Sequence, residues 1–261
     1  MFSIKRAISK FRKIYEAKFL FRCFVFIASA VLFFVAPEEY DIMSGWNFFK
    51  EFSIFHILWL IWMADMLLQV FPSRKFLPLG STKFSLKDFV PRDIRNMKKL
   101  QDLIDYIKKC NLDTIKIGLV WFALTAVIGI LYFTGIISRN LLLLLSVAFY
   151  VCDLICVLFW CPFRVWFMKN RCCTTCRIFN WDHMMMFSPI VFVPGFFTWS
   201  LCAAAILVLA IWEISFALHP ERFYEGTNKA LQCSNCTDRL CGEKSNCRAT
   251  LPSIDNITKD I

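Results

Sequence analysis

Long apolar runs separated by short polar segments dominate the chain, and this pattern predicts helices that cross a membrane. Such a span needs about 20 apolar residues. Five runs approach or exceed that length, namely residues 23–36 (extended by 19–21), 54–71, 117–137, 141–163 and 190–218. Only a short turn separates the third run from the fourth, so these two are expected to form an antiparallel hairpin. We predict an all-α, polytopic membrane helix bundle of about five spans.

Two basic segments show helical periodicity. In residues 1–22 and again in 94–107, within the loop 73–116, apolar residues recur at three- and four-residue steps with Lys and Arg between them. A basic amphipathic helix of this kind lies in the headgroup layer, where anionic lipids are its partners. Packing on the protein itself is the alternative. Arg22, at the start of the first run, is expected to snorkel to the interface.

The distribution of charge predicts the orientation. Basic residues collect at the N-terminus, in the loop 73–116 and in the loop 164–189, whereas the linker 37–53 is acidic. By the positive-inside rule the N-terminus is cytoplasmic. Five crossings then place the tail, residues 219–261, outside. If Pro194 and Gly195 instead turn a re-entrant segment back, the tail is cytoplasmic, but 29 apolar residues fall short of the roughly 40 that two spans need.

Composition supports the membrane assignment. Hydrophobic residues make up 58% of the 261 residues and charged residues only 19%, with a mean hydropathy of +0.54. A soluble domain of this length is about one quarter charged. The net charge of +10 is divided into blocks between apolar runs. We therefore attribute it to cytoplasmic loops and expect no nucleic-acid partner.

Seven of the 13 cysteines lie in polar surroundings and predict a metal site. Cys172, Cys173 and Cys176 form a C-C-x-x-C sequence, and His183 is a plausible fourth ligand for zinc or an iron–sulfur cluster. Acylation of these juxtamembrane thiols, or no ligand at all, are the alternatives. The other six cysteines are interpreted as small buried hydrophobes: Cys23, Cys110, Cys152, Cys156, Cys161 and Cys202.

The tail carries the second cluster. Its four thiols, in the spacing C-x2-C-x4-C-x5-C, can hold an ion without further ligands: Cys233, Cys236, Cys241 and Cys247. The side of the membrane decides their chemistry, because a reducing compartment favours thiolates and an oxidising one favours two disulfides. Two glycosylation sequons, at Asn235 and Asn256, fit an external tail.

Carboxylates within the apolar runs indicate a different chemistry. Asp65, Asp153 and Glu213 are expected to face the bundle interior with a partner, because an exposed charge at bilayer depth is costly. Asp65 and Asp153 are the candidates for a proton relay. Three functions result: a metal or redox protein that serves or anchors a redox partner, a proton- or cation-linked transporter, and a non-catalytic scaffold. No phosphate-binding loop or hydrolase motif appears.

Overall fold

The computed structural model describes residues 10–71, 84, 89–92, 97–170, 172–232 and 235 of the chain. The helices are α1 (Lys10–Val35), α2 (Phe55–Val70), α3 (Met97–Phe133), α4 (Arg139–Leu158), α5 (Asp182–Phe187) and α6 (Phe196–Leu218). Shorter 3-10 and π turns connect them: η1 (Pro37–Met43), η2 (Asn47–Phe49), η4 (Phe163–Met168), η5 (Cys173–Thr175), η6 (Phe179–Trp181), η7 (Ser188–Phe192), η8 (Pro220–Arg222) and η9 (Lys229–Leu231).

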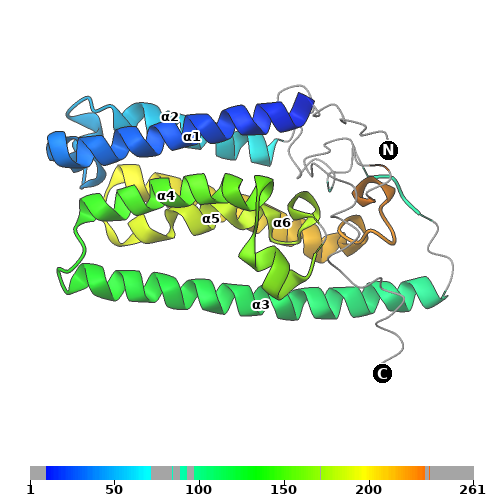
Figure 1. The fold of residues 1–261 in the computed structure, drawn as a ribbon. Helices are drawn as coiled ribbons and strands as arrows, with labels where there is room; N and C mark the ends of the chain where they lie inside the picture. The colour runs from blue at the N-terminus through cyan, green and yellow to red at the C-terminus, as the bar shows by residue number, and fades with distance from the viewer. Residues whose placement is uncertain are drawn as a thin grey trace, which may run out of the picture.

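These helices lie side by side in one elongated bundle (Figure 1). Four of them, α1, α3, α4 and α6, are long and apolar enough to cross a membrane, and α2 is a shorter apolar helix. The part of the chain described here contains no strand, only two isolated β-bridges. The predicted all-α membrane helix bundle is therefore confirmed.

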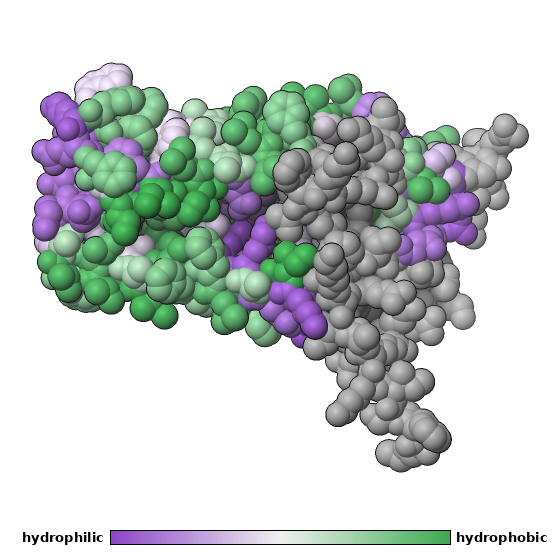
Figure 2. Space-filling view, turned by 90° about the horizontal axis from the view of Figure 1, so that it is seen from above, coloured by the Kyte–Doolittle hydropathy of each residue, from purple (hydrophilic) through white to green (hydrophobic). Residues whose placement is uncertain are grey.

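The two ends of the bundle differ in charge and in the segments that form them. At one end, called the basic end, lie the starts of α1 and α3, residues 159–181 and residues 219–232 (Figure 1). The opposite end consists of residues 36–54, 134–138 and 193–195. Figure 2 shows hydrophilic residues at the opposite end and an apolar band beside it. Exposed side chains such as Phe24, Phe34, Leu119 and Phe122 contribute to the apolar surface that lipid would cover.

Neither predicted amphipathic helix is a separate element. Lys10 to Val35 form one continuous helix, so the described part of the N-terminal basic segment leads straight into the first apolar run. The second periodic segment is likewise joined to the third run in α3, whose 37 residues extend for about 55 Å. Pro91, which precedes this helix, pairs with Asn228 in a β-bridge. Helical periodicity continues across both junctions, and a change of polarity alone does not end a helix.

The segment between residues 182 and 192 differs most from expectation. The sequence predicts a cytoplasmic loop up to residue 189, whereas α5 and η7 carry the chain from the basic end back through the bundle. They pack against α3, α4 and α6, and Met186, Phe187 and Ile190 are buried. A broken helix is tolerated at membrane depth when protein surrounds it. The passage is short because it combines an α-helical turn with a 3-10 turn of greater rise per residue.

The chain turns at Pro194 and Gly195, and α6 then returns to the basic end. This turn belongs to the re-entrant arrangement that the sequence left open, and it divides the predicted span 190–218, so that α6 begins at Phe196. Residues 219–232 consequently lie beside the basic loop. The Arg92 N–H donates to the Thr227 carbonyl at 2.9 Å, and the Lys229 N–H donates to the Val90 carbonyl at 3.0 Å.

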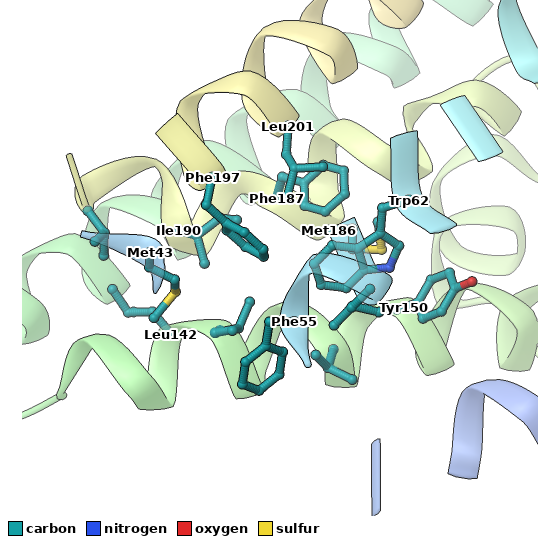
Figure 3. Close-up of a cluster of buried hydrophobic side chains, with 14 of the residues drawn as sticks. Met43, Phe55, Trp62, Leu142, Tyr150, Met186, Phe187, Ile190, Phe197 and Leu201 are labelled. Carbon is teal, nitrogen blue, oxygen red and sulfur yellow. The ribbon is translucent and has the colours of Figure 1, made fainter. Parts of the chain in front are cut away.

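Aromatic and aliphatic side chains from α2, α3, α4, α5 and α6 and from the η1 and η7 turns form the main core (Figure 3). Trp62 of α2 is fully buried, and its ring packs edge-on against Phe187 of α5 at 5.1 Å and Tyr150 of α4 at 5.9 Å between centroids. Phe197 and Leu201 of α6 complete this layer. The core thus holds the broken α5–η7 segment inside the bundle.

Candidate functional site

Arg22 occupies the centre of a buried polar cluster between α1, α2 and α4. Its guanidinium donates to Asp153 Oδ2 at 2.6 Å, to Asp65 Oδ2 at 3.4 Å and to the Tyr150 carbonyl at 2.7 Å. The guanidinium carbon also lies 3.9 Å from the centroid of the Tyr150 ring. The side chain is only 7% exposed. The expectation that Arg22 snorkels to the interface is wrong, because two intramembrane carboxylates hold it inside the bundle.

Asp182 and His183, at the start of α5, extend this cluster. His183 Nδ1 lies 3.2 Å from Asp182 Oδ2, and His183 Nε2 lies 4.0 Å from Asp65 Oδ2. The amide of Gln69, one helical turn after Asp65, donates to Asp182 Oδ2 at 2.9 Å. His183 is almost completely buried, with a side chain 3% exposed. The imidazole therefore stands between two carboxylates that come from different helices.

A cavity of about 30 Å³ borders the cluster, large enough for about two water molecules. Lys18, one turn before Arg22, lines it together with Asp65, Asp153 and Asp182. Gln69 Oε1 and Asp182 Oδ1 are buried and have no hydrogen-bond partner in the protein. Both residues line this cavity, so a water molecule within it would satisfy them. We call these six side chains the Arg22 cluster: Lys18, Arg22, Asp65, Asp153, Asp182 and His183.

The loop cysteines do not converge as the metal prediction requires. Cys172 Sγ contacts the Thr174 hydroxyl at 3.2 Å, whereas Cys173 Sγ donates to the Cys156 carbonyl at 3.0 Å. Cys176 is buried in another cluster, with Ile117 and Ile178, and this burial raises the pKa of its thiol to about 12. Within the described ranges no group of three His, Cys, Asp or Glu side chains is arranged to hold a metal ion.

His183 belongs to the Arg22 cluster, where it lies beside the carboxylates of Asp65 and Asp182 and the Phe187 ring. The four tail cysteines, Cys233, Cys236, Cys241 and Cys247, lie outside the described residues, as does Asn256. The metal prediction for them therefore remains a prediction. An iron–sulfur cluster or zinc held by the loop alone would need Cys172, Cys173 and Cys176 to turn toward one point, which they do not do here.

A third group of thiols escaped the sequence analysis. The sulfur of Cys161, just after α4, accepts the Arg164 N–H at 3.4 Å, and the Cys173 thiol donates to the Cys156 carbonyl at 3.0 Å. Cys156 and Cys161 were interpreted as buried hydrophobes because their neighbours in sequence are apolar. The five-residue spacing between them follows the end of a helix, and only the fold brings Cys173 to the same place.

Glu213, the third intramembrane carboxylate, also has a buried partner. Arg177 makes a two-point ion pair with it, and the Trp181 indole N–H donates to Glu213 Oε1 at 2.8 Å. The Arg177 guanidinium stacks on the Phe216 ring at 3.8 Å, and Trp212 Nε1 donates to the Arg177 carbonyl at 2.7 Å. These contacts fix the cysteine loop to α6. Because its hydrogen bonds join the loop to α6, we assign this pair a structural role.

Comparison with protein-family models, curated proteins and solved structures finds no match for this chain. The arrangement of the Arg22 cluster and of the cysteines is therefore the basis for its function.

Proposed function

We propose that this chain is a proton-linked membrane transport protein in which the Arg22 cluster binds the coupling proton. The observation that carries the proposal is the meeting of Asp65 and Asp153, from two separate apolar helices, at one buried guanidinium. Carboxylates at membrane depth are uncommon and typically mark proton or ion pathways. A water-sized cavity beside them offers a route for proton exchange.

Charge balance supports proton binding over a purely structural ion pair. Arg22 and Lys18 supply two positive charges, while Asp65, Asp153 and Asp182 supply three negative charges. A buried cluster with an unbalanced charge is unstable in a low-dielectric surrounding. One proton makes the six side chains neutral, and His183 can take up that proton because it lies beside Asp182 and Asp65. A structural pair such as Arg177–Glu213 has no such imbalance.

Histidine NMR tests this proposal directly, because the chain contains only three histidines. In lipid nanodiscs we expect His183 to bind a proton, and Asp182→Asn to lower the pKa at which it does so. The physical reason is that the carboxylate 3.2 Å away favours the imidazolium. Asp41→Asn is the matched control, since Asp41 pairs with Arg139 at the opposite end. His183 that stays neutral between about pH 4 and pH 9 would contradict proton binding.

Transport itself is tested in proteoliposomes by following internal pH after an acid step outside. We expect Asp153→Asn to slow proton entry several-fold relative to wild type, with Asp41→Asn unchanged. His183 could bind a proton while wild-type vesicles acidify no faster than empty vesicles under either sign of membrane potential. In that case the cluster binds a proton but does not let protons cross the membrane on their own. The NMR result and the flux result thus separate binding from movement.

The orientation forms part of the same proposal. Among the described residues, the basic end carries exposed cations such as Lys13 of α1 and Lys108 and Lys109 of α3, so the positive-inside rule supports a cytoplasmic location for it. Residues 219–232 lie at this end, which supports a cytoplasmic tail. The exposed Lys13 on α1 and Lys116 on α3 are placed to attract anionic lipids of the inner leaflet. The opposite end then faces outward, with Glu38, Glu39 and Glu51.

A metal or redox role is the second candidate, and one observation favours it. The segment that precedes the tail cysteines and the loop with Cys172, Cys173 and Cys176 lie at the same end of the bundle. Thiolates from both could then share an iron–sulfur cluster or zinc and serve a redox partner.

Metal analysis of anaerobically purified protein tests this candidate. We expect about one bound zinc, or the iron of one cluster, per chain if it is correct. Replacing Cys233 and Cys236 by Ser should then remove the metal, and Cys202→Ser should retain it. Metal-free protein isolated under these conditions would leave proton linkage as the only function we propose.

A further inference from the structure

The cavity beside the Arg22 cluster presents the atoms that a small metal cation binds. Gln69 Oε1 and Asp182 Oδ1 are buried and have no hydrogen-bond partner among the described residues, and both residues line the cavity. The side chains of Asp65 and Asp153 line it as well. Carboxylate and amide oxygens are the ligands that hard cations prefer in proteins. Three negative charges against two positive ones leave this site suited, by charge and by donor atoms, to an alkali-metal ion as well as to a proton.

Lys18 is the lining residue that opposes a metal ion. It lies on α1, one helical turn before Arg22, and borders the same cavity as the oxygen atoms. The cavity holds only about 30 Å³, so a metal ion within it would be a close neighbour of the Lys18 side chain. Like charges that are close together and poorly screened by water repel each other strongly. Lys18 thus supplies from within the chain the positive charge that a metal ion would bring.

A proton is not subject to the same obstacle. His183 is not one of the cavity-lining residues in the described part of the chain, and it stands between Asp182, at 3.2 Å, and Asp65, at 4.0 Å. A proton on the imidazole occupies no volume in the cavity and needs no shell of oxygen ligands. The site can therefore accept a proton at His183 while Lys18 keeps the cavity closed to a larger cation.

We infer that Lys18 makes the Arg22 cluster selective for a proton over sodium and other alkali-metal ions. The inference rests on the proton binding proposed above and names the residue that decides which cation the site accepts. A neutral residue at this position would leave only Arg22 against the three carboxylates, and it would free the place of the ammonium group. A sodium ion is then expected to bind where Lys18 supplies its charge in the wild type.

Equilibrium dialysis of the full chain in nanodiscs against radioactive sodium tests this selectivity. Lys18→Gln and Lys18→Met should retain several-fold more sodium than wild type, in a saturable manner, whereas Lys18→Arg keeps the charge and should resemble wild type. Lys13→Gln is the matched control, because Lys13 is an exposed lysine of the same helix and does not line the cavity. Thermal unfolding without sodium verifies that each variant folds, and added sodium should stabilise only the two neutral Lys18 variants.

Histidine NMR supplies a second readout, which a merely structural role of Lys18 would not change. Exchange of choline chloride for sodium chloride at constant ionic strength should lower the proton affinity of His183 in Lys18→Gln and leave it unchanged in wild type. Sodium sensitivity of wild-type His183 overturns the inference, and this measurement needs no variant. Sodium binding by Lys18→Gln but not by Lys18→Met overturns it too, because the added amide oxygen would then be responsible.

The same experiments separate this inference from the proposed function. A wild-type His183 that does not titrate contradicts proton binding itself and removes the basis of the inference. A His183 that titrates, together with neutral Lys18 variants that bind no more sodium than wild type, contradicts only the role assigned to Lys18.

Discussion

Replacement of Arg22 by Ala is expected to lower the free energy of unfolding by about 3–5 kcal/mol, the range for removal of one partner of a buried ion pair. The guanidinium is 7% exposed and serves two carboxylates, Asp65 and Asp153, whose side chains are 19% and 23% exposed. Without it, these groups either carry an uncompensated charge inside the bundle or bind protons. Chemical or thermal unfolding in a mild detergent measures the loss.

A double replacement tests the cause of this effect. Asp153→Asn in the Arg22→Ala background removes one of the uncompensated charges and should recover part of the stability. Arg12→Ala on the same helix is the matched control, because its ion pair with Glu16 is exposed and such pairs contribute at most about 1 kcal/mol. Equal losses for Arg22→Ala and Arg12→Ala, or no recovery in the double variant, would show that Arg22 is not held by these carboxylates.

Replacement of Gly195 by Ala is expected to cost about 3 kcal/mol of unfolding free energy, at the upper end of the range for overpacking. An added Cβ would stand 1.9 Å from the Met43 carbonyl oxygen, and that neighbour is backbone. Hydrogen bonds from the Gly45 N–H to Pro194 and from the Phe196 N–H to Gly45 hold the two segments together. They cannot separate without opening the turn that returns the chain into α6.

Gly118→Ala provides the control in the same unfolding assay. A Cβ at that position in α3 would meet the Trp181 ring at 3.7 Å, an ordinary van der Waals contact, so stability should hold or rise slightly. If Gly195→Ala unfolds like wild type, the close approach of Gly195 to Met43 and Gly45 is not part of the folded protein, and the turn between η7 and α6 takes another path.

Much of the helical architecture could be predicted from the amino-acid sequence. Apolar runs of sufficient length became α1, α3, α4 and α6, since lipid accepts only backbone whose hydrogen bonds are satisfied within the segment. The expectation that Asp65 and Asp153 face a buried partner was also correct. That partner could have been found, because Arg22 is the one basic residue that adjoins the first apolar run. The rule that basic side chains near a helix end extend to the membrane interface predicted the wrong orientation for the Arg22 side chain.

The cysteine assignments show where sequence reasoning is weakest. Neighbours in sequence suggested that Cys172, Cys173 and Cys176 act together, but each of these side chains meets a different part of the fold. The Cys173 thiol donates to the backbone carbonyl of Cys156, a residue interpreted only as a buried hydrophobe. Spacing along a loop constrains ligand geometry only when the loop is free to close around an ion, and this loop is fastened by Arg177 and Cys173.

The sequence by itself determined that this chain is a membrane helix bundle, because hydrophobic length and satisfied backbone hydrogen bonds leave no other solution in lipid. Only the tertiary structure decided that residues 182–192 cross the bundle and that the tail begins at the basic end. This segment is short and broken, with Ser188 and Pro189 within it, and it cannot face lipid alone. Its path therefore depends on its packing against α3, α4 and α6. For the same reason the Arg22 cluster exists only in the folded protein, where that segment brings Asp182 and His183 to the carboxylates of α2 and α4.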